Sequence, residues 1–154
     1  MFARISLFAA GIVTLVLLAT VGRVFFQELF GGPASTLARV EAVTAAVEED
    51  IKASVPVQVN EITRLVGADA VGRDFYFFYT VDASRNDIAF EAVQAAVLGN
   101  VETAICGDAE LAWLSKHGTT FIYSYIDNSN EPFAEVPVPP DQCGDVPPPP
   151  EREG

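Results

Sequence analysis

The sequence has few of the residues from which catalytic and nucleic-acid sites are usually built. It contains one histidine, His117, and nine Lys and Arg residues against 21 Asp and Glu, which gives a net charge of −12. No run of basic residues occurs along the chain. Because binding to phosphates needs clustered Lys or Arg, the composition argues against a nucleic-acid partner. The acidity itself is a common means of keeping a protein soluble.

The chain also lacks the motifs of the common metal, redox and nucleophile sites. Its two cysteines, Cys106 and Cys143, do not form a Cys-x-x-Cys pair, and no matching set of histidines accompanies them. No Gly-x-Ser-x-Gly sequence occurs, and residues 127–131 are too short for an EF-hand loop and are interpreted as a turn. We therefore expect no catalytic residue, no cofactor and no metal site, and we interpret His117 as a helix-end residue.

What the chain does have is one long apolar run near its N-terminus. Residues Ile5 to Gly22 carry no charge, and such a run spans about 27 Å as a helix, close to the hydrocarbon thickness of a bilayer. Arg4 favours a cytoplasmic N-terminus, although Arg23 on the other side weakens the bias. The run predicts a single-pass inner-membrane anchor with the C-terminal domain in the periplasm. The alternative is a cleaved signal peptide and a secreted protein.

The anchor bears on the two cysteines, because either alternative delivers the rest of the chain to an oxidising compartment. There we expect Cys106 and Cys143 to form a structural disulfide between the end of a helix and the end of the last strand. Closing a loop of this length stabilises a domain by roughly 3–4 kcal/mol in the chain-entropy estimate.

The remaining chain divides by composition into segments. After an anchor and flank at residues 1–30, residues 31–54 form an amphipathic helix in which apolar residues recur at helical spacing. Residues 55–143 make up an α+β extracytoplasmic domain. Residues 144–154 contain four consecutive prolines and predict a disordered tail.

Within the domain, β-branched and aromatic residues predict four strands. A helix is expected to begin at Ser84 or Asn86 and to reach about Ala104, and a shorter one is capped by Asp108 and stopped by Gly118. The predicted fold is α+β: an N-terminal transmembrane helix, the amphipathic helix, then a four-stranded antiparallel sheet of two hairpins packed on a helix. The expected strands are Val57–Val66, Arg73–Val81, Thr119–Ile126 and Phe133–Val138.

The second strand is unusual because its aromatic residues, from Phe75 to Tyr79, fall on both faces. One face must meet the core, and the other needs a cover from a helix, the N-terminal segment, a partner or a neighbouring aromatic side chain. Core packing is the common use of such residues. As a possible binding face we single out the following aromatic residues: Tyr76, Phe78, Trp113, Tyr123 and Tyr125.

Three stretches of the domain carry a resemblance. They begin at Val55 (Val-Pro-Val-Gln-Val-Asn-Glu-Ile-Thr-Arg-Leu), at Phe75 (Phe-Tyr-Phe-Phe-Tyr-Thr-Val) and at Leu114 (Leu-Ser-Lys-His-Gly-Thr-Thr-Phe-Ile-Tyr-Ser-Tyr-Ile-Asp). Together with the two cysteines, they resemble a group of uncharacterised small exported or single-pass bacterial proteins with a two-cysteine α+β domain. The resemblance covers roughly residues 55 to 143. It implies a fold and no activity.

The sequence therefore predicts a membrane-anchored, periplasmic, non-enzymatic domain that binds another protein, associates with itself or supports an envelope complex. Its membrane contact is the run from Ile5 to Gly22. The alternative is a secreted or anchored small-ligand binder, enzyme or inhibitor with its site between the sheet and a helix. A deep polar pocket that held His117 would favour the enzyme, and a solid apolar core would exclude it.

Overall fold

The computed structural model describes residues 33–149, and side chains from residue 36 onward. Contacts divide the chain into two units between Arg39 and Val40. Apart from residues 33–39 of the first helix, which belong to the first unit, the fold described below is that of the second. The apolar run from Ile5 to Gly22 lies outside the described residues. Across residues 33–149, no helix combines the length and the apolar character that crossing a membrane requires.

Within the described residues, helix α2 spans Pro33–Ser54, and its end at Ser54 is the one that the sequence predicts. The residues that repeat every three or four positions, Val40, Val43, Val47 and Ile51, pack against the core cluster of the second unit. The amide of Val55 donates the last helical hydrogen bond to the carbonyl of Ile51, at 3.0 Å. Pro56 cannot donate the next one, so the helix ends there.

The sheet is five-stranded and mixed, which corrects the predicted four-stranded antiparallel sheet. The strands lie in the order β1-β2-β3-β4-β5. The two predicted hairpins, β2–β3 and β4–β5, are antiparallel, but β3 and β4 pair in parallel. The strand bounds are β1 Val57–Gln58, β2 Thr63–Val71, β3 Asp74–Val81, β4 Thr120–Ile126 and β5 Pro132–Val138.

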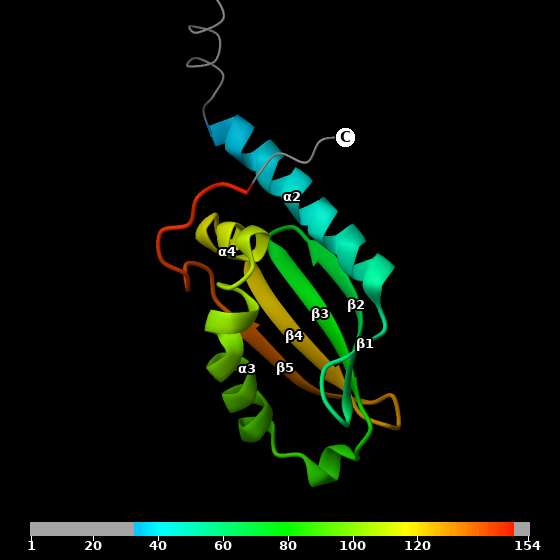
Figure 1. The fold of residues 1–154 in the computed structure, drawn as a ribbon. Helices are drawn as coiled ribbons and strands as arrows, with labels where there is room; N and C mark the ends of the chain where they lie inside the picture. Colours follow the sequence, from blue (N-terminus) through cyan, green and yellow to red (C-terminus); the bar gives the residue numbers. More distant parts are fainter. Residues whose placement is uncertain (1–32, 150–154) are drawn as a thin grey trace, which may run out of the picture. The chain divides into compact units, whose positions relative to one another are not determined.

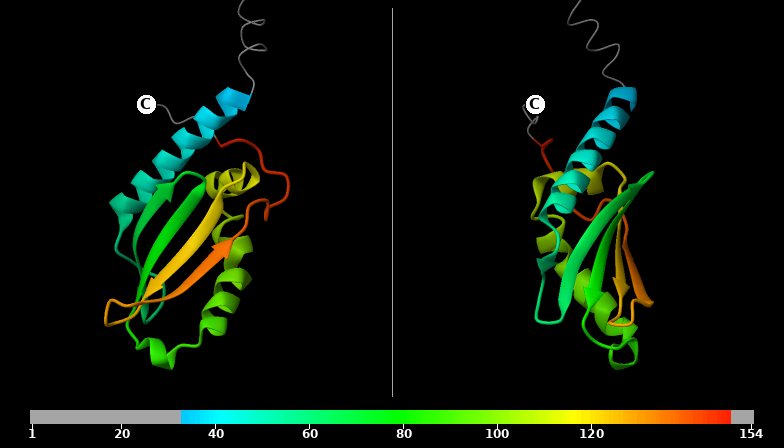
Figure 2. Two further views of the ribbon diagram at one scale, coloured as in Figure 1. Left: turned by 180° about the vertical axis from the view of Figure 1, so that it is seen from behind. Right: turned by 90° about the vertical axis from the view of Figure 1, so that its right-hand side faces the viewer.

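The parallel pair follows from the long connection between β3 and β4. This connection contains a 3₁₀ helix, η1 (Arg85–Asp87), and two α-helices, α3 (Phe90–Ala104) and α4 (Ala109–Lys116). A helical crossover of this length brings the chain back to the starting end of β3, so β4 runs in the same direction as β3. Figures 1 and 2 show α3, α4 and α2 on one face of the sheet, with the strands forming the second layer.

The first predicted strand is also split in two. The side chain of Asn60 accepts hydrogen bonds from the amides of Ile62 and Thr63, at 3.0 and 2.9 Å. This turn separates β1 from β2, and β2 extends to Val71, beyond the predicted end of the strand at Val66. The hairpin then closes at Gly72, whose φ of 64° suits a residue without a side chain.

The long predicted helix begins later than expected. Ser84 does act as a cap, because its side chain accepts the amide of Asn86, but it caps the 3₁₀ helix η1. The chain is extended at Ile88 and Ala89, and α3 begins at Phe90. Helix α4 agrees with the prediction: Asp108 caps it by accepting the amides of Glu110 and Leu111, and Gly118 follows it with a φ of 93°.

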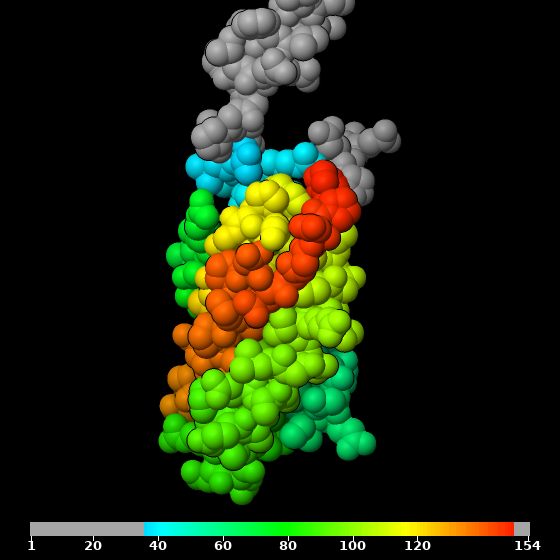
Figure 3. Space-filling model, turned by 90° about the vertical axis from the view of Figure 1, so that its left-hand side faces the viewer, coloured from blue at the N-terminus to red at the C-terminus, as the bar shows by residue number. Residues whose placement is uncertain are grey.

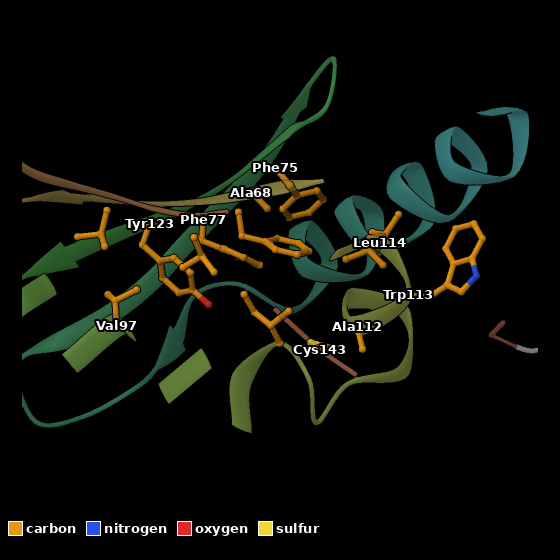
Figure 4. Packing of buried hydrophobic residues seen from close by; sticks show 14 residues of the cluster. Ala68, Phe75, Phe77, Val97, Ala112, Trp113, Leu114, Tyr123 and Cys143 are labelled. Atoms are coloured by element: carbon orange, nitrogen blue, oxygen red, sulfur yellow. The ribbon is translucent and has the colours of Figure 1, made fainter. Parts of the chain in front are cut away.

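The core lies between the helices and one face of the sheet. Phe75 and Phe77 of β3 and Phe121 and Tyr123 of β4 are buried there, and Figure 4 shows Phe75, Phe77 and Tyr123 in one cluster with Val97 of α3. On the other face, Tyr76 and Phe78 stack on each other with ring centroids 6.1 Å apart. Phe78 remains 37% exposed, so its ring has only a partial cover among the described residues.

The predicted disulfide between Cys106 and Cys143 is confirmed, with the two Cα atoms 5.4 Å apart. It joins the end of α3 to the segment that follows β5. Cys143 is buried and Val146 packs against the core cluster. In the space-filling view, this C-terminal segment, coloured orange to red, lies over α4, coloured yellow (Figure 3).

Candidate functional site

A groove opens on the helical side of the sheet and has a volume of about 510 Å³. One wall is helix α3, the opposite wall is the loop between β1 and β2, and the floor is formed by side chains of β3, β4 and β5. We refer to it as the α3 groove. It exists because the apolar face of the sheet is wider than the part of it that α3 covers.

Three tyrosines form the floor of the α3 groove. Tyr79 stacks on Tyr125 with ring centroids 4.9 Å apart, and on Tyr123 at 5.9 Å. The register explains the arrangement, since Tyr79 and Tyr125 are partners in the parallel β3–β4 pair. Phe133 of β5 extends the aromatic floor, with its ring 6.2 Å from that of Tyr125.

The floor favours uncharged groups. Burial raises the pKa of Tyr123 and of Tyr125 to about 12, and the neighbouring phenol of Tyr125 adds to the effect at Tyr123. Burial also raises the pKa of Tyr79, by more. Raised phenol pKa values mean that an anion in this place is poorly solvated. The groove is therefore suited to apolar groups and to neutral hydrogen-bonding groups.

Helix α3 presents a smooth wall because its groove side carries small residues. Ala92 and Ala96 lie one helical turn apart and line the groove, with Asn100 a further turn along. Val93 and Val97 lie deeper and contact the core cluster. The alanines leave room beside the helix that larger side chains would fill.

The opposite wall is an exposed apolar loop. Val59 and Ile62 both line the groove, and their exposed fractions are 56% and 47%. Asn60 holds the loop in shape through its hydrogen bonds to the amides of Ile62 and Thr63. Exposed aliphatic residues next to an open groove are typical of a binding surface.

In the described part of the chain, the groove is lined only by apolar side chains and by the neutral polar groups of Asn, Thr and Tyr residues. The residues that line it include no Asp, Glu, His, Lys, Arg or Cys, and the described residues contain no group of carboxylates, histidines and cysteines that could hold a metal ion. A general acid–base mechanism needs a titratable group near neutral pH. The tyrosines, with pKa values raised above 10, do not supply one.

The five aromatic residues singled out from the sequence fall into three places. Tyr123 and Tyr125 lie on the floor of the groove. Tyr76 and Phe78 alternate with the core residues of β3 and so lie on the opposite face of the sheet. Trp113 is buried on α4, at the other end of the core cluster from Tyr123 (Figure 4). Only the first two belong to one candidate site.

His117 takes the structural position that the sequence predicts, at the C-terminal cap of α4. Its Nδ1 lies 2.8 Å from the carbonyl oxygen of Trp113, and its ring lies 3.9 Å from the Trp113 ring. It does not line the α3 groove.

The residues that sequence reasoning missed are those of the two walls. Ala92 and Ala96 were hidden because alanine is a common residue of any helix. A signal was present in the opposite wall, where the apolar residues Val59 and Ile62 stand among polar ones and do not enter the core. Tyr79 could have been added through the strand register, had the parallel pairing been known.

Comparison with known proteins identifies relatives of the fold. No protein-family model matches the sequence, and no curated protein sequence matches it. Solved structures do match. A presumed secreted protein from Pseudomonas aeruginosa aligns with a TM-score of 0.52 and 18% identity over 65% of this chain and 88% of its own.

Two further matches are pilotins of type 2 secretion systems. EpsS from Vibrio vulnificus aligns with a TM-score of 0.52 and 9% identity, over 66% of this chain and 88% of its own. AspS from Vibrio cholerae aligns with a TM-score of 0.52 and 13% identity, over 68% of this chain and 93% of its own. At these identities, the matches show a shared fold.

Proposed function

We propose that this chain is an extracytoplasmic, non-enzymatic accessory protein that binds a partner protein in the α3 groove. The observation that carries the proposal is the groove itself: an open, uncharged channel with an aromatic floor between α3 and the β1–β2 loop. The disulfide supports an oxidising compartment. The shared fold supports the same setting, since those structures are described as a secreted protein and as secretion-system pilotins.

The architecture of the floor favours a helical segment of the partner. Strands β3 and β4 are central, and each is paired on both sides. An incoming strand therefore finds no free backbone groups to pair with on the floor. A helix satisfies its own backbone hydrogen bonds and can place an apolar face on the tyrosines, as in other complexes of a helix in a groove. Small residues at Ala92 and Ala96 allow its close approach.

A small apolar ligand is the second candidate for the same groove. Its volume of about 510 Å³ falls within the range of roughly 300–1,000 Å³ that small-molecule pockets occupy. The polar groups of Asn60, Asn100 and the tyrosines would orient such a ligand. An enzyme at this place is disfavoured, because no side chain in the groove titrates near neutral pH.

A matched pair of charge substitutions tests the proposal. Ala96 lines the groove, and the adjacent Ala95 is exposed on α3 outside the groove. In full-length protein purified from cell envelopes, Ala96→Glu should abolish co-purification of the extracytoplasmic partner, because a carboxylate would be buried against apolar groups. Ala95→Glu should retain it.

Two results would contradict a protein partner. One is equal recovery of co-purifying proteins from both variants. The other is native mass spectrometry that shows a small molecule on the unaltered protein and on Ala95→Glu but not on Ala96→Glu, which would establish the small-ligand alternative.

The proposal includes anchoring by residues Ile5 to Gly22, with the domain in the periplasm. The length and lack of charge of this run support it. The N-terminal sequence of the mature protein tests it directly. An intact N-terminus on protein that stays in the membrane pellet after alkaline washing is expected, whereas a new N-terminus near Gly22 on soluble protein would show a cleaved signal peptide.

A further inference from the structure

Helix α3 is held unevenly along its length. In its first half, Phe90 is 40% exposed and Val93 is only half-buried. Val97 is the single fully buried residue of the helix. Ile105, directly after the helix, is completely buried. The residues that hold α3 to the domain are therefore Val97, in the middle of the helix, and Ile105, directly after it, whereas the first two turns of the helix have no buried residue.

A covalent bond fixes that C-terminal end. Cys106 follows Ile105 and forms the disulfide with Cys143, which is itself buried beyond β5. The amides of Ile105 and Cys106 both donate to the carbonyl of Val101, at 2.9 and 3.2 Å. The last turn of α3 therefore cannot leave the sheet without larger unfolding.

The middle of α3 contains a glycine that packing does not require. A Cβ atom added at Gly99 would meet nothing within 4 Å. Glycine weakens a helix interior relative to alanine, because more backbone freedom is lost on folding. Gly99 is thus a flexible point of the helix at a position where no neighbouring atom would exclude a larger side chain.

The segment before α3 adds little restraint. The 3₁₀ helix η1 has no buried residue. It is connected to the β4–β5 turn through the amide of Arg85, 3.4 Å from Asp127 Oδ2, and through the carbonyl of Ala83, which accepts the amide of Asn128 at 3.2 Å. These hydrogen bonds hold residues 83–85 in place. Among the residues that the structure describes, the start of α3 is held to the domain only by the packing of its side chains.

We propose that residues 90–98 of α3 form a movable wall of the groove, which bends at Gly99 while the disulfide fixes residues 101–106. This rests on the proposed function, since the groove is what the movement would widen. The side chains that leave the floor when the wall moves are Val93 and Val97, and both line the groove. An incoming apolar helix would replace their contacts with the tyrosines, so the wall can open without exposing the floor to water.

Amide hydrogen exchange on the full-length protein in detergent, without any partner, tests the movable wall. Local opening of a loosely packed segment exposes its amides more often than global unfolding does. We expect the amides of residues 94–98 to exchange at least about tenfold faster than those of residues 101–105. Gly99→Ala should slow exchange at residues 94–98. Gly144→Ala is the matched control, because a Cβ there also meets nothing within 4 Å, and it should leave α3 unchanged.

Equal protection along α3, or a Gly99→Ala variant that exchanges like the unaltered protein, would overturn the movable wall. Because no partner is present, that result would leave the proposed function standing. Conversely, equal co-purification from Ala96→Glu and Ala95→Glu would contradict the proposed function without altering the exchange pattern.

Discussion

The rings of Tyr79 and Tyr125 stack across the parallel pair of strands at the centre of the sheet, with centroids 4.9 Å apart. This contact forms the floor of the α3 groove, and it depends on a pairing that joins residues far apart in the sequence. In a purely antiparallel arrangement of two separate hairpins, the two rings would not be neighbours. The candidate site is thus a product of the crossover through α3 and α4.

The tyrosine floor predicts a loss of stability in alkali. Because the pKa values of Tyr123 and Tyr125 are raised to about 12 in the folded protein, the phenols ionise first in the unfolded chain, near their ordinary pKa of 10. Their contribution to stability is complete below pH 10 and falls as the pH rises toward 12.

Denaturant unfolding at several pH values between 8 and 12 measures this effect. The double variant Tyr123→Phe, Tyr125→Phe should lose less stability over this range than the unaltered protein, because the two phenols that ionise when the protein unfolds are removed. An identical pH dependence in the two proteins would show that the floor is open enough to accommodate phenolates.

Asp127 predicts a loss of stability in acid. Its Oδ1 accepts the amides of Glu131 and Ser129, at 3.0 and 2.8 Å. The hydrogen bond from Glu131 is the largest cause of a lowered pKa at Asp127, and burial opposes it. A lowered folded pKa means that the contribution to stability is present above the ordinary value of 3.8 and is lost as the pH falls below it.

The check is thermal unfolding from pH 6 to pH 2. Asp127→Asn should flatten the acid side of the profile, because asparagine keeps the acceptor and does not titrate. Asp82→Asn, at an exposed position at the end of β3, serves as the comparison and should keep the acid dependence. A profile for Asp127→Asn that follows the unaltered protein throughout would remove Asp127 as a cause of acid sensitivity.

The disulfide predicts that the protein without its two cysteines is much less stable than the oxidised protein. Cys106 and Cys143 close a loop with a sequence separation of 37 residues, for which the chain-entropy estimate gives about 4 kcal/mol. Cys106→Ala, Cys143→Ala should therefore lower the melting temperature by roughly 15 °C in a domain of this size. Calorimetry with and without a thiol reductant checks the value. A double variant that melts like the oxidised parent would contradict the estimate.

Gly118 and Gly99 predict effects of opposite sign. Gly118 has a φ of 93°, and a Cβ there would lie 2.6 Å from Arg73 Nη1. Gly118→Ala should therefore destabilise the domain by roughly 1–3 kcal/mol. Gly99→Ala should stabilise α3 by about 1 kcal/mol, since its site is helical and open. Urea denaturation of both variants measures the two effects, and a shift of the same sign in both would contradict this assignment.

The sequence was informative wherever a signal is local. Asp108 and Gly118 mark the ends of α4 through capping and backbone preferences that act within one turn, and the structure agrees at both. The two cysteines could be paired because only one intramolecular pairing exists. The turn at residues 127–131 was likewise predicted from its composition, and the side chain of Asp127 accounts for it.

What the sequence could not supply is the relation between distant segments. The register of Tyr79 against Tyr125 depends on a parallel pairing across some forty intervening residues. The later start of β2 depends on the side chain of Asn60, because it accepts the amides of Ile62 and Thr63 and so interrupts the strand that the residue pattern predicts from Val57 onward. The groove depends on the distance between α3 and the β1–β2 loop. The small side chains of Ala92 and Ala96 leave this space open, and the spacing of apolar residues along the chain does not predict it.

Site-specific photo-crosslinking in intact cells tests the central claim most directly. A photo-reactive phenylalanine analogue at position 59, an exposed residue of the groove wall, leaves the room beside Ala96 unfilled, and the same analogue at position 71, which is exposed outside the groove, is the control. We expect a discrete adduct with one extracytoplasmic protein from position 59, through an apolar helical segment of that protein, and little or none from position 71. Equal adducts from both positions, or none from position 59 while position 71 reacts, would contradict a partner in the α3 groove.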